Sequence, residues 1–162
     1  MAGTTTDGTA AAAALAAAGP LRGRTAAVVG CGAAGRAAAA ALSSAGARVT
    51  LVNRGTGRGQ RAATSLGLAF VPLRDFTPSR YGIVVHATPL ADDVPFSVDR
   101  LRAGTTVADF VCSAEPTALA TAARGRGLAV IDGRTILEHE IAQQFQLMTG
   151  RPIPPVGNHQ GR

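Results

Sequence analysis

Six consecutive residues, Gly30-Cys31-Gly32-Ala33-Ala34-Gly35, have the types and spacing of a turn that can hold a pyrophosphate. In such a turn Gly30 permits the tight bend, Gly32 lets the backbone approach the ligand, and Gly35 lets the next helix pack on the preceding strand. The helix then offers free N–H groups and the positive end of its dipole to the phosphates. The spacing therefore predicts a dinucleotide-binding turn.

The residues on both sides of this turn support the prediction. An apolar run, Ala26 to Val29, precedes it, and an alanine-rich helical run, Arg36 to Ala45, follows it. A second apolar run, Arg48 to Val52, comes at the distance expected of a strand–helix–strand unit. The alternative is a glycine-rich turn in an alanine-rich protein, but the strand and helix patterns favour a ligand site.

The end of the second apolar run indicates which dinucleotide is bound. NAD-binding proteins usually carry Asp or Glu there, which accepts hydrogen bonds from the ribose. Here the run ends in Asn53-Arg54, Arg58 and Arg61 follow, and residues 8–74 contain no acidic side chain. Guanidinium groups suit a phosphate by charge and by forked geometry, so we expect NADP rather than NAD. A solvated basic loop is the alternative.

Apolar runs alternate with helical patterns along the whole chain, which predicts a parallel sheet covered by helices on both faces. The expected strands span residues 25–29, 48–53, 68–73, 82–87, 105–111 and 128–132. The expected helices span residues 8–19, 33–45, 58–66, 115–126 and 135–148. We predict an α/β, Rossmann-like, doubly wound and mainly parallel sheet of about six strands. Gly30, Asn53, Thr88 and Cys112 should then border one crevice at the carboxyl ends of the strands.

Length and composition limit the function classes. The 162 residues fit one domain, expected over residues 1–150, followed by a flexible tail, residues 151–162, rich in Pro and Gly. The net charge is +6, yet every basic residue other than histidine is arginine, and no lysine is present for chemistry. The arginines are scattered and aromatic residues are few, so nucleic-acid binding is not expected.

Cysteine and histidine usage indicates neither a disulfide scaffold nor a metal site. Cys31 and Cys112 are the only cysteines, neither has a CxxC partner, and the three histidines are far apart in the sequence. We therefore expect a reduced, cytoplasmic protein without a metal. No stretch is long and apolar enough to predict a membrane span.

Several segments are similar, in order, to motifs of one known family. They are Val28 to Ala37, Asn53-Arg54 with Arg58, His86 to Leu90, Ala108 to Leu119, and Asp132 to Phe145. They resemble the glycine turn, the Asn-Arg-Thr clamp for the 2′-phosphate, the Asn-Ala-Thr-Pro motif, the Ala-Asp-x-Val-Tyr segment and the last helix of the shikimate dehydrogenases. The match is to the C-terminal, NADP-binding domain of that family.

This resemblance implies which residues contact the cofactor NADP. They are Gly30, Gly32, Ala33, Ala34, Asn53, Arg54, Arg58, Ala87, Thr88, Pro89 and Gly133. His86 stands where the family motif has Asn. It could meet the nicotinamide ribose, or it could be a buried histidine with satisfied hydrogen bonds.

The substrate side departs further from the family. The segment Thr5 to Gly8 resembles the family's Asn-Thr-Asp-Gly, in which the Asp pairs with a lysine to handle the substrate proton. The resemblance makes Asp7 the candidate catalytic residue, although a helix N-cap is the alternative. At positions that contact substrate in the family, Thr5 stands for Asn, Cys112 for Tyr and Glu140 for Gln. Cys112 could simply line a cleft, and Glu140 could be a polar position on an amphipathic helix.

The resemblance implies an NADP-dependent oxidoreductase of the kind that serves aromatic amino acid biosynthesis. Hydride would pass between NADP(H) and a shikimate- or quinate-like cyclic hydroxy acid. The family's N-terminal substrate domain and its lysine have no counterpart in this sequence, so a substrate domain would act in trans. The alternative is a non-catalytic NADP-binding module: a remnant, a sensor or one half of a split enzyme.

The predicted helices at both ends of the chain indicate a partner. If nothing covers them, residues 8–18 and 135–148 leave apolar surface exposed, including Leu137, Ile141 and Met148. We expect either a homo-oligomer or a partner chain over these helices.

Overall fold

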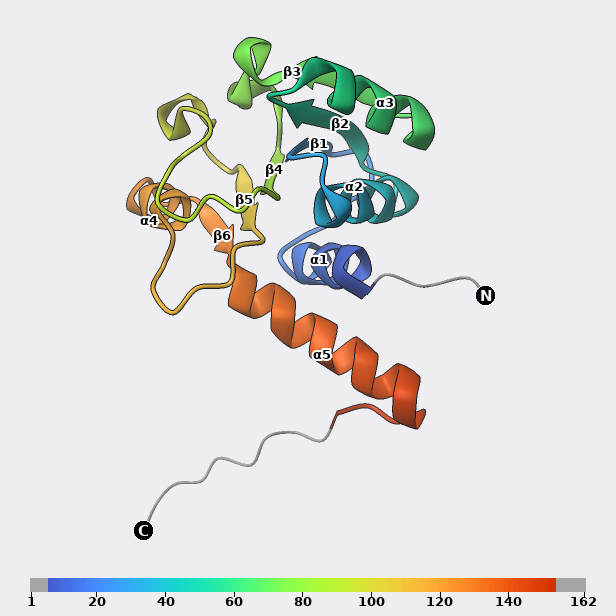
Figure 1. Cartoon of the computed structure of the whole chain (residues 1–162). Coiled ribbons are helices and arrows are strands. Elements are labelled where there is room, and N and C mark those ends of the chain that lie inside the picture. Colours follow the sequence, from blue (N-terminus) through green and yellow to red (C-terminus); the bar gives the residue numbers. More distant parts are fainter. Residues whose placement is uncertain (1–5, 154–162) are drawn as a thin grey trace.

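The computed structural model describes residues 6–153, which form one parallel sheet with helices on both sides (Figure 1). The strand order is β3-β2-β1-β4-β5-β6. The strands are β1 Thr25–Val29, β2 Arg48–Asn53, β3 Ala69–Pro72, β4 Ile83–His86, β5 Thr106–Asp109 and β6 Ala129–Ile131. Because the order reverses between β1 and β4, the predicted Rossmann-like, doubly wound sheet is confirmed, and β1 and β4 flank its switch point.

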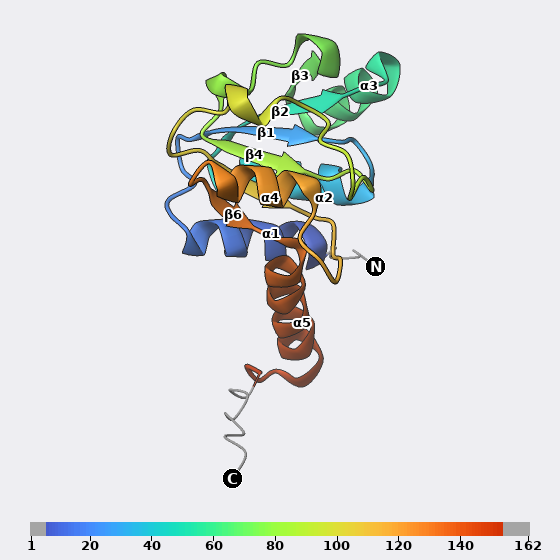
Figure 2. The same cartoon turned by 90° about the vertical axis from the view of Figure 1, so that its left-hand side faces the viewer.

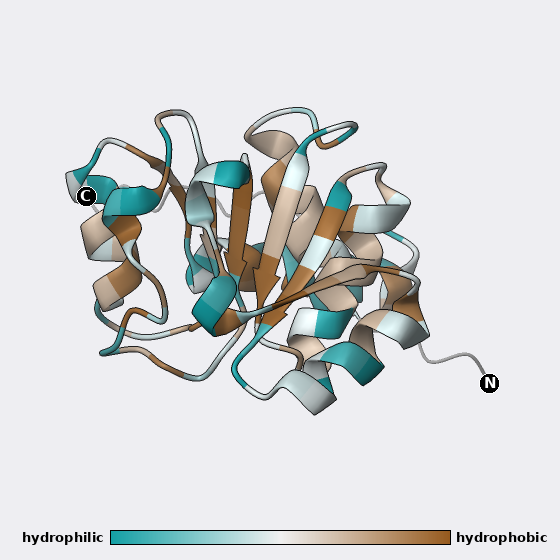
Figure 3. Ribbon diagram, turned by 90° about the horizontal axis from the view of Figure 1, so that it is seen from above, coloured by the Kyte–Doolittle hydropathy of each residue, from teal (hydrophilic) through white to brown (hydrophobic). Residues whose placement is uncertain are grey.

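The helices divide between the two faces of the sheet. They are α1 Thr6–Ala17, α2 Ala33–Ser44, α3 Thr56–Leu66, α4 Ala118–Gly125 and α5 Gly133–Thr149. In Figure 1, α1, α2 and α3 lie on one side of the strands and α4 on the other. Successive strand residues point to opposite faces of the sheet, so they belong to two different hydrophobic cores. Val28 belongs to the cluster with α1, α2 and α3, and Val29 belongs to the cluster with α4. Figure 3 shows the resulting apolar strands at the centre of the molecule.

Small residues bring the helices of the first face close together. Alanines of α1 and α2, such as Ala11 and Ala38, are fully buried. A Cβ atom at Gly8 of α1 would overlap the backbone carbonyl of Ala37 in α2. The alanine-rich composition therefore gives close backbone contact in place of large interlocking side chains.

The described crossovers from β3 to β5 contain no α-helix, and the sequence predicted none there. Short 3₁₀ turns, rather than long helices, connect β3 to β4 and β4 to β5. They are η1 Leu73–Asp75, η2 Pro78–Arg80 and η3 Val98–Arg100. Their buried apolar side chains, among them Phe76, Tyr81 and Val98, fill the core beside α4. Prolines and aromatics in these segments break the helical period, so irregular backbone covers the sheet here.

Helix α5 contacts α1 along its first three turns and extends beyond the body of the molecule only at its C-terminal end (Figures 1 and 2). Its buried residues are Gly133 and Ile136, whereas Ile141 is 47%, Leu147 70% and Met148 86% exposed. The apolar stripe predicted on this helix therefore covers no core in the described part of the chain. By contrast, the apolar residues of α1 are buried, so the prediction of exposed apolar surface holds for α5 and is wrong for α1.

Two predictions fall largely outside the described residues. Thr5 lies outside them, as does most of the predicted tail, residues 151–162. No helix in the described part combines the length and the apolar character needed to cross a bilayer.

Candidate functional site

A cavity of 650 Å³ lies at the switch point of the sheet; we call it the large cavity. It is lined by Val29, Gly30, Cys31, Gly32, Asn53, Arg54, Arg58, Leu73, Ala87, Thr88, Pro89, Leu90, Asp93, Val94 and Pro95. Most of these residues come from the carboxyl ends of β1, β2 and β4 and from the loop after β4, while Arg58 comes from α3 and Leu73 follows β3. Of the four residues predicted to border one crevice, Gly30, Asn53 and Thr88 line this cavity, and Cys112 lines a neighbouring one.

The glycine turn has the backbone that its sequence predicts. Gly30 has a φ of +110°, and a Cβ there would lie 2.5 Å from the carbonyl oxygen of Ala87 and 3.0 Å from the Thr88 methyl. A Cβ at Gly35 would overlap the carbonyl oxygen of Gly30. At Gly32, by contrast, nothing lies within 4 Å of the added atom. Two of the glycines therefore permit close packing, and the third leaves open space beside the large cavity.

The N-terminus of α2 faces this open space without a side-chain cap. Its N-cap is Gly32, which makes no capping hydrogen bond. The first N–H groups of a helix have no partner within the helix, and they carry the positive end of its dipole. This end of the large cavity is therefore suited to an anion.

Basic side chains also line the large cavity. Arg54 and Arg58 are exposed, and the Asn53 amide holds the loop between β2 and α3 by donating from Nδ2 to the Gly55 carbonyl at 2.9 Å. An adjoining cavity of 330 Å³, the arginine cavity, is lined by Cys31, Arg36, Arg58, Arg61, Ala62 and Ser65. Among residues 6–153, the ion pairs of arginine involve only Arg74 and Arg124, so the arginines of this cavity have no carboxylate partner.

Arg36 was not singled out as a candidate site residue from the sequence. It lies in the first turn of α2, directly after Gly35, and this position beside the glycine turn is the signal that could have found it. The thiol of Cys31 lies in the same cavity. Burial raises the pKa of Cys31, although nearby Arg58 and Arg36 act in the opposite direction. The thiol is therefore a neutral lining group.

A second cavity of 480 Å³, the side cavity, adjoins the large cavity. It is lined by Asp7, Ala34, Ala87, Thr88, Pro89, Phe110, Val111, Cys112, Gly133, Ile136, Leu137 and Glu140. Ala87, Thr88 and Pro89 line both cavities. The fold thus brings together Asp7, Cys112 and Glu140, which the sequence related to substrate. Among the described residues, no basic side chain lines the side cavity.

Asp7 and Glu140 form a carboxyl pair between α1 and α5. Glu140 Oε1 accepts hydrogen bonds from Thr6 Oγ1 at 3.1 Å and from Gln144 Nε2 at 2.8 Å. Burial, followed by the hydrogen bond and negative charge of Asp7, raises the pKa of the Glu140 carboxyl, while Thr6 acts in the opposite direction. Because α1 begins at Thr6, Asp7 lies inside the first turn of the helix rather than at its N-cap.

His86 is fully buried and is satisfied at both ring nitrogens. Nδ1 lies 3.0 Å from Asp109 Oδ1, and Nε2 lies 2.5 Å from Thr88 Oγ1. His86 lines neither the large nor the side cavity. Of the two interpretations of this residue, the structure favours a buried histidine whose hydrogen bonds are all made within the protein. Its link to the large and side cavities is the hydrogen bond to Thr88.

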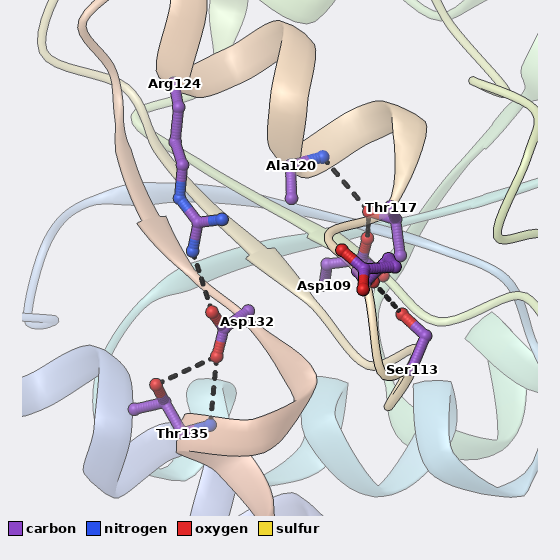
Figure 4. Close-up of polar contacts among 8 residues, drawn as sticks. Asp109, Ser113, Thr117, Ala120, Arg124, Asp132 and Thr135 are labelled. Atoms are coloured by element: carbon purple, nitrogen blue, oxygen red, sulfur yellow. Dashed lines mark hydrogen bonds and ion pairs between the residues drawn. The ribbon is translucent and has the colours of Figure 1, made fainter.

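Asp109 anchors this histidine from the end of β5. Its Oδ2 accepts from Thr117 Oγ1 at 2.5 Å (Figure 4). Its Oδ1 accepts from the backbone N–H of Val111 at 3.1 Å. Burial alone would raise the pKa of Asp109, but the hydrogen bonds from His86, Thr117 and Val111 outweigh it and hold the pKa below its ordinary value. Asp109 is therefore an ionised carboxylate that only accepts hydrogen bonds.

Most of the predicted cofactor residues line the large cavity. They are Gly30, Gly32, Asn53, Arg54, Arg58, Ala87, Thr88 and Pro89. Ala34 and Gly133 line the side cavity instead, and Ala33, in the first turn of α2, lines neither. Within residues 6–153, no three His, Cys, Asp or Glu side chains are grouped so as to hold a metal ion.

A smaller cavity of 210 Å³ lies beside Asp109 and Asp132. Asp132 caps α5 by accepting from the N–H of Thr135 at 3.0 Å, and it pairs with Arg124 at 2.7 Å (Figure 4). The hydrogen bond from Thr135 and the contact with Arg124 together lower the pKa of Asp132. Both carboxylates are thus engaged within the fold.

The sheet order, the glycine turn and the cavity at the switch point are those of the Rossmann-like class of domains. A family model described as an FAD binding domain matches residues 25–92, which contain the glycine turn and the strands on both sides of the switch point. That match covers the part of the fold that FAD- and NAD(P)-binding proteins have in common.

Within this class, the chain is similar to one part of the shikimate dehydrogenases. It is 38% identical over 140 residues to the shikimate dehydrogenase (NADP(+)) of Halobacterium salinarum, a match over 83% of this chain and 53% of that protein. The shikimate 5-dehydrogenase of Thermus thermophilus, solved in complex with NADP(H) and shikimate, is 32% identical with a TM-score of 0.82, over 93% of this chain and 58% of that one.

The fold also resembles a reductase that is named for a different substrate. The 5-ketofructose reductase of a Gluconobacter strain is 25% identical with a TM-score of 0.83, over 93% of this chain and 59% of that one. The chain spans about half the length of the curated relatives that it matches. The predicted resemblance to the shikimate dehydrogenases is confirmed, and it covers one part of those enzymes.

Proposed function

We propose that the chain is the NADP-binding domain of an oxidoreductase that transfers hydride between NADP(H) and a shikimate- or quinate-like cyclic hydroxy acid. The observation that carries this proposal is the junction of the two cavities: the large cavity, with the glycine turn and the arginines, meets the carboxyl-lined side cavity at Ala87, Thr88 and Pro89. The names of the related enzymes support the same cofactor and substrate class.

The large cavity offers a separate group to each part of the nucleotide. The arginines Arg54 and Arg58 would bind the 2′-phosphate, and the N-terminus of α2 at Gly32 would bind the pyrophosphate. The nicotinamide would then lie near Thr88, where the two cavities meet. NADP(H), when bound, supplies or accepts the hydride.

The side cavity offers a group that can hold the proton of the reaction. Oxidation of a hydroxyl group or reduction of a ketone needs an acid or base near the reacting oxygen. Asp7 and Glu140 line this cavity as a pair, and the raised pKa of Glu140 keeps its proton to a higher pH than an ordinary glutamate. The chain has no lysine, so we propose that a substrate-binding domain supplies that group in trans.

A non-catalytic NADP-binding module or subunit is the second candidate. One observation favours it: the carboxyl pair puts negative charge where a carboxylated substrate would sit. Such a module would keep the large cavity as a nucleotide site and would turn nothing over without a second polypeptide.

We also propose a partner for the apolar face of α5, either a second copy of this chain or a chain that carries the substrate site. Leu147 and Met148 are exposed on that helix. Exposed apolar surface of this kind marks interaction sites. The free cysteines Cys31 and Cys112 support a reducing, cytosolic location.

Calorimetric titration of NADPH against NADH tests the cofactor assignment. Arg54→Ala should weaken NADPH about 10- to 100-fold, because it removes a charged hydrogen-bond donor to phosphate, and it should weaken NADH less than about threefold. Arg48→Ala is the matched control, because Arg48 is an exposed arginine at the other end of β2. Equal losses for both nucleotides, or no binding by the wild type, would remove the basis of the proposal.

Turnover assays with shikimate and quinate then separate the two candidate functions. Binding of NADPH without turnover supports the module. Turnover by the chain alone would show that Asp7 and Glu140 suffice and that no lysine in trans is needed.

A further inference from the structure

A chain of hydrogen bonds links α4 to the junction of the two cavities. It runs from Thr117 to Asp109, from Asp109 to His86, and from His86 to Thr88. Three of its members, Thr117, Asp109 and His86, are buried, and only Thr88 lines the cavities. The buried part of this chain is therefore able to act on a ligand in the large or the side cavity only through the Thr88 hydroxyl.

We propose that His86 is a positioning residue that fixes the Thr88 hydroxyl as a hydrogen-bond acceptor for the carboxamide NH₂ of the nicotinamide ring. This inference rests on the proposed function, because it requires a nicotinamide nucleotide in the large cavity. It assigns a role to a histidine that stands where the family motif has asparagine.

The direction of each hydrogen bond follows from the carboxylate. Ionised Asp109 has no proton to donate, so Nδ1 of His86 must carry the hydrogen that joins them. A neutral imidazole has only one N–H group, which leaves Nε2 as an acceptor. The hydroxyl of Thr88 has one hydrogen, and it donates that hydrogen to Nε2. The hydroxyl then offers only lone pairs to the cavities.

The side chain of Thr88 is held on both sides. Its methyl group lies against the glycine turn, 3.0 Å from where a Cβ of Gly30 would stand, and its hydroxyl meets His86. Because both groups of the side chain are in contact, the lone pairs of Thr88 Oγ1 point in a fixed direction. A fixed acceptor favours a ligand with an N–H donor at that point over one without it, because an unmatched polar group loses its hydrogen bond with water.

The nicotinamide carboxamide is the N–H donor that the proposed binding mode brings to the junction. Its replacement by an acetyl group, in the 3-acetylpyridine analogue of NADP⁺, exchanges NH₂ for a methyl group and leaves the carbonyl in place. The affinity ratio of the two nucleotides therefore reports whether an acceptor faces the NH₂ group, while the phosphates contribute equally to both.

Calorimetry at about pH 8, above the ordinary range of histidine protonation, measures this ratio. The wild type should prefer NADP⁺ by about fivefold to tenfold, which is the effect of one hydrogen bond. Thr88→Val should abolish the preference, and Thr88→Ser should keep it. His86→Asn should reduce the preference, because the amide can still donate to Asp109 but offers nothing at the position of Nε2. His86→Gln, which can place an acceptor near that position, should restore part of it.

The tautomer of His86 gives a second readout that needs no nucleotide. Nitrogen-15 NMR of the wild type at about pH 8 should show one neutral ring with hydrogen on Nδ1, and that signal should vanish in His86→Asn. A ring with hydrogen on Nε2, or a doubly protonated ring, would reverse the direction of the bond to Thr88 and overturn the inference.

The outcomes separate this inference from the proposed function. If the wild type binds neither nucleotide, the proposed function fails, and the role of Thr88 fails with it. If the wild type binds NADP⁺ and the analogue equally well, the cofactor assignment stands and only this inference is overturned. If His86→Asn does not fold, Thr88→Val and the wild-type NMR spectrum still decide the question.

Discussion

Glu140 shows how one residue can set both the stability and the chemistry of the side cavity. It lies beside Asp7, and its carboxylate accepts two hydrogen bonds, from Thr6 and Gln144. A carboxyl group whose pKa is raised in the folded state contributes stability that is complete below its unfolded pKa. That stability is lost as the pH rises through the folded pKa. Ionised Glu140 therefore costs the fold stability at neutral pH.

Glu140→Gln should accordingly raise the melting temperature at about pH 7.5 by about 1–3 °C. The glutamine side chain would keep the acceptor for Thr6 while removing the charge beside Asp7. The gain should shrink at about pH 4, where the carboxyl of the wild type is protonated in both states. Thermal unfolding followed by circular dichroism across this pH range measures it. Glu138→Gln, which neutralises an exposed carboxylate of the same helix, should show no such pH-dependent gain. A fall in melting temperature for Glu140→Gln at about pH 7.5 would contradict the account of the pair.

At the scale of elements, the strand–turn–helix unit of β1 and α2 depends on glycines with different tasks. Gly35→Ala should cost about 2 kcal/mol or more, because the new methyl group would overlap the carbonyl of Gly30. Gly32→Ala should cost about 1 kcal/mol or less, because the site is open and its φ of −72° suits any residue. Urea unfolding measures both changes.

Gly32→Ala should nevertheless weaken the binding of NADPH about tenfold or more, since the methyl group would stand where the pyrophosphate must approach the backbone. A stable Gly35→Ala protein, or a Gly32→Ala protein with full affinity, would contradict this division.

The elements that sequence predicted well are those whose residues contact one another locally. Alternating apolar runs predicted all the strands, and the spacing of Gly30, Gly32 and Gly35 predicted the turn that the large cavity requires. The sequence did not predict the 3₁₀ turns between β3 and β5. Their shape is set by aromatic packing against the sheet rather than by a repeating pattern of apolar residues.

The candidate site was predicted unevenly for the same physical reason. Motif spacing predicted the residues at strand ends, since parallel strands end along one edge of the sheet. Motif spacing did not predict the role of Asp109, and for Arg36 it offered only the position beside the glycine turn. The first depends on a contact between neighbouring strands, β4 and β5, and the second on the approach of α2 to α3. Asp7 lies inside the first turn of α1, where it reaches Glu140, and not at the N-cap that was its alternative interpretation.

At the scale of the whole molecule, α5 is the element that the fold leaves least covered. Polar hydrogen bonds tie its middle to α1, with Thr9 Oγ1 donating to Gln143 Oε1 at 2.7 Å. Beyond that contact Leu147 and Met148 are exposed at 70% and 86%. An apolar helix end that contributes nothing to the core of its own domain is free to contribute to an interface.

Replacing both of these residues with glutamine should therefore separate folding from association. The melting temperature of the dilute protein should change by less than about 2 °C, because exposed side chains far from the core contribute little to folding. Sedimentation velocity at micromolar concentration should show the wild type as an oligomer and the double variant as a monomer, and Gln146→Asn on the same turn should leave the oligomer intact. A wild type that sediments as a monodisperse monomer would count against self-association. The same double variant would then test the other partner: it should lose binding to the chain that carries the substrate site, because that chain would have to cover the same apolar end of α5.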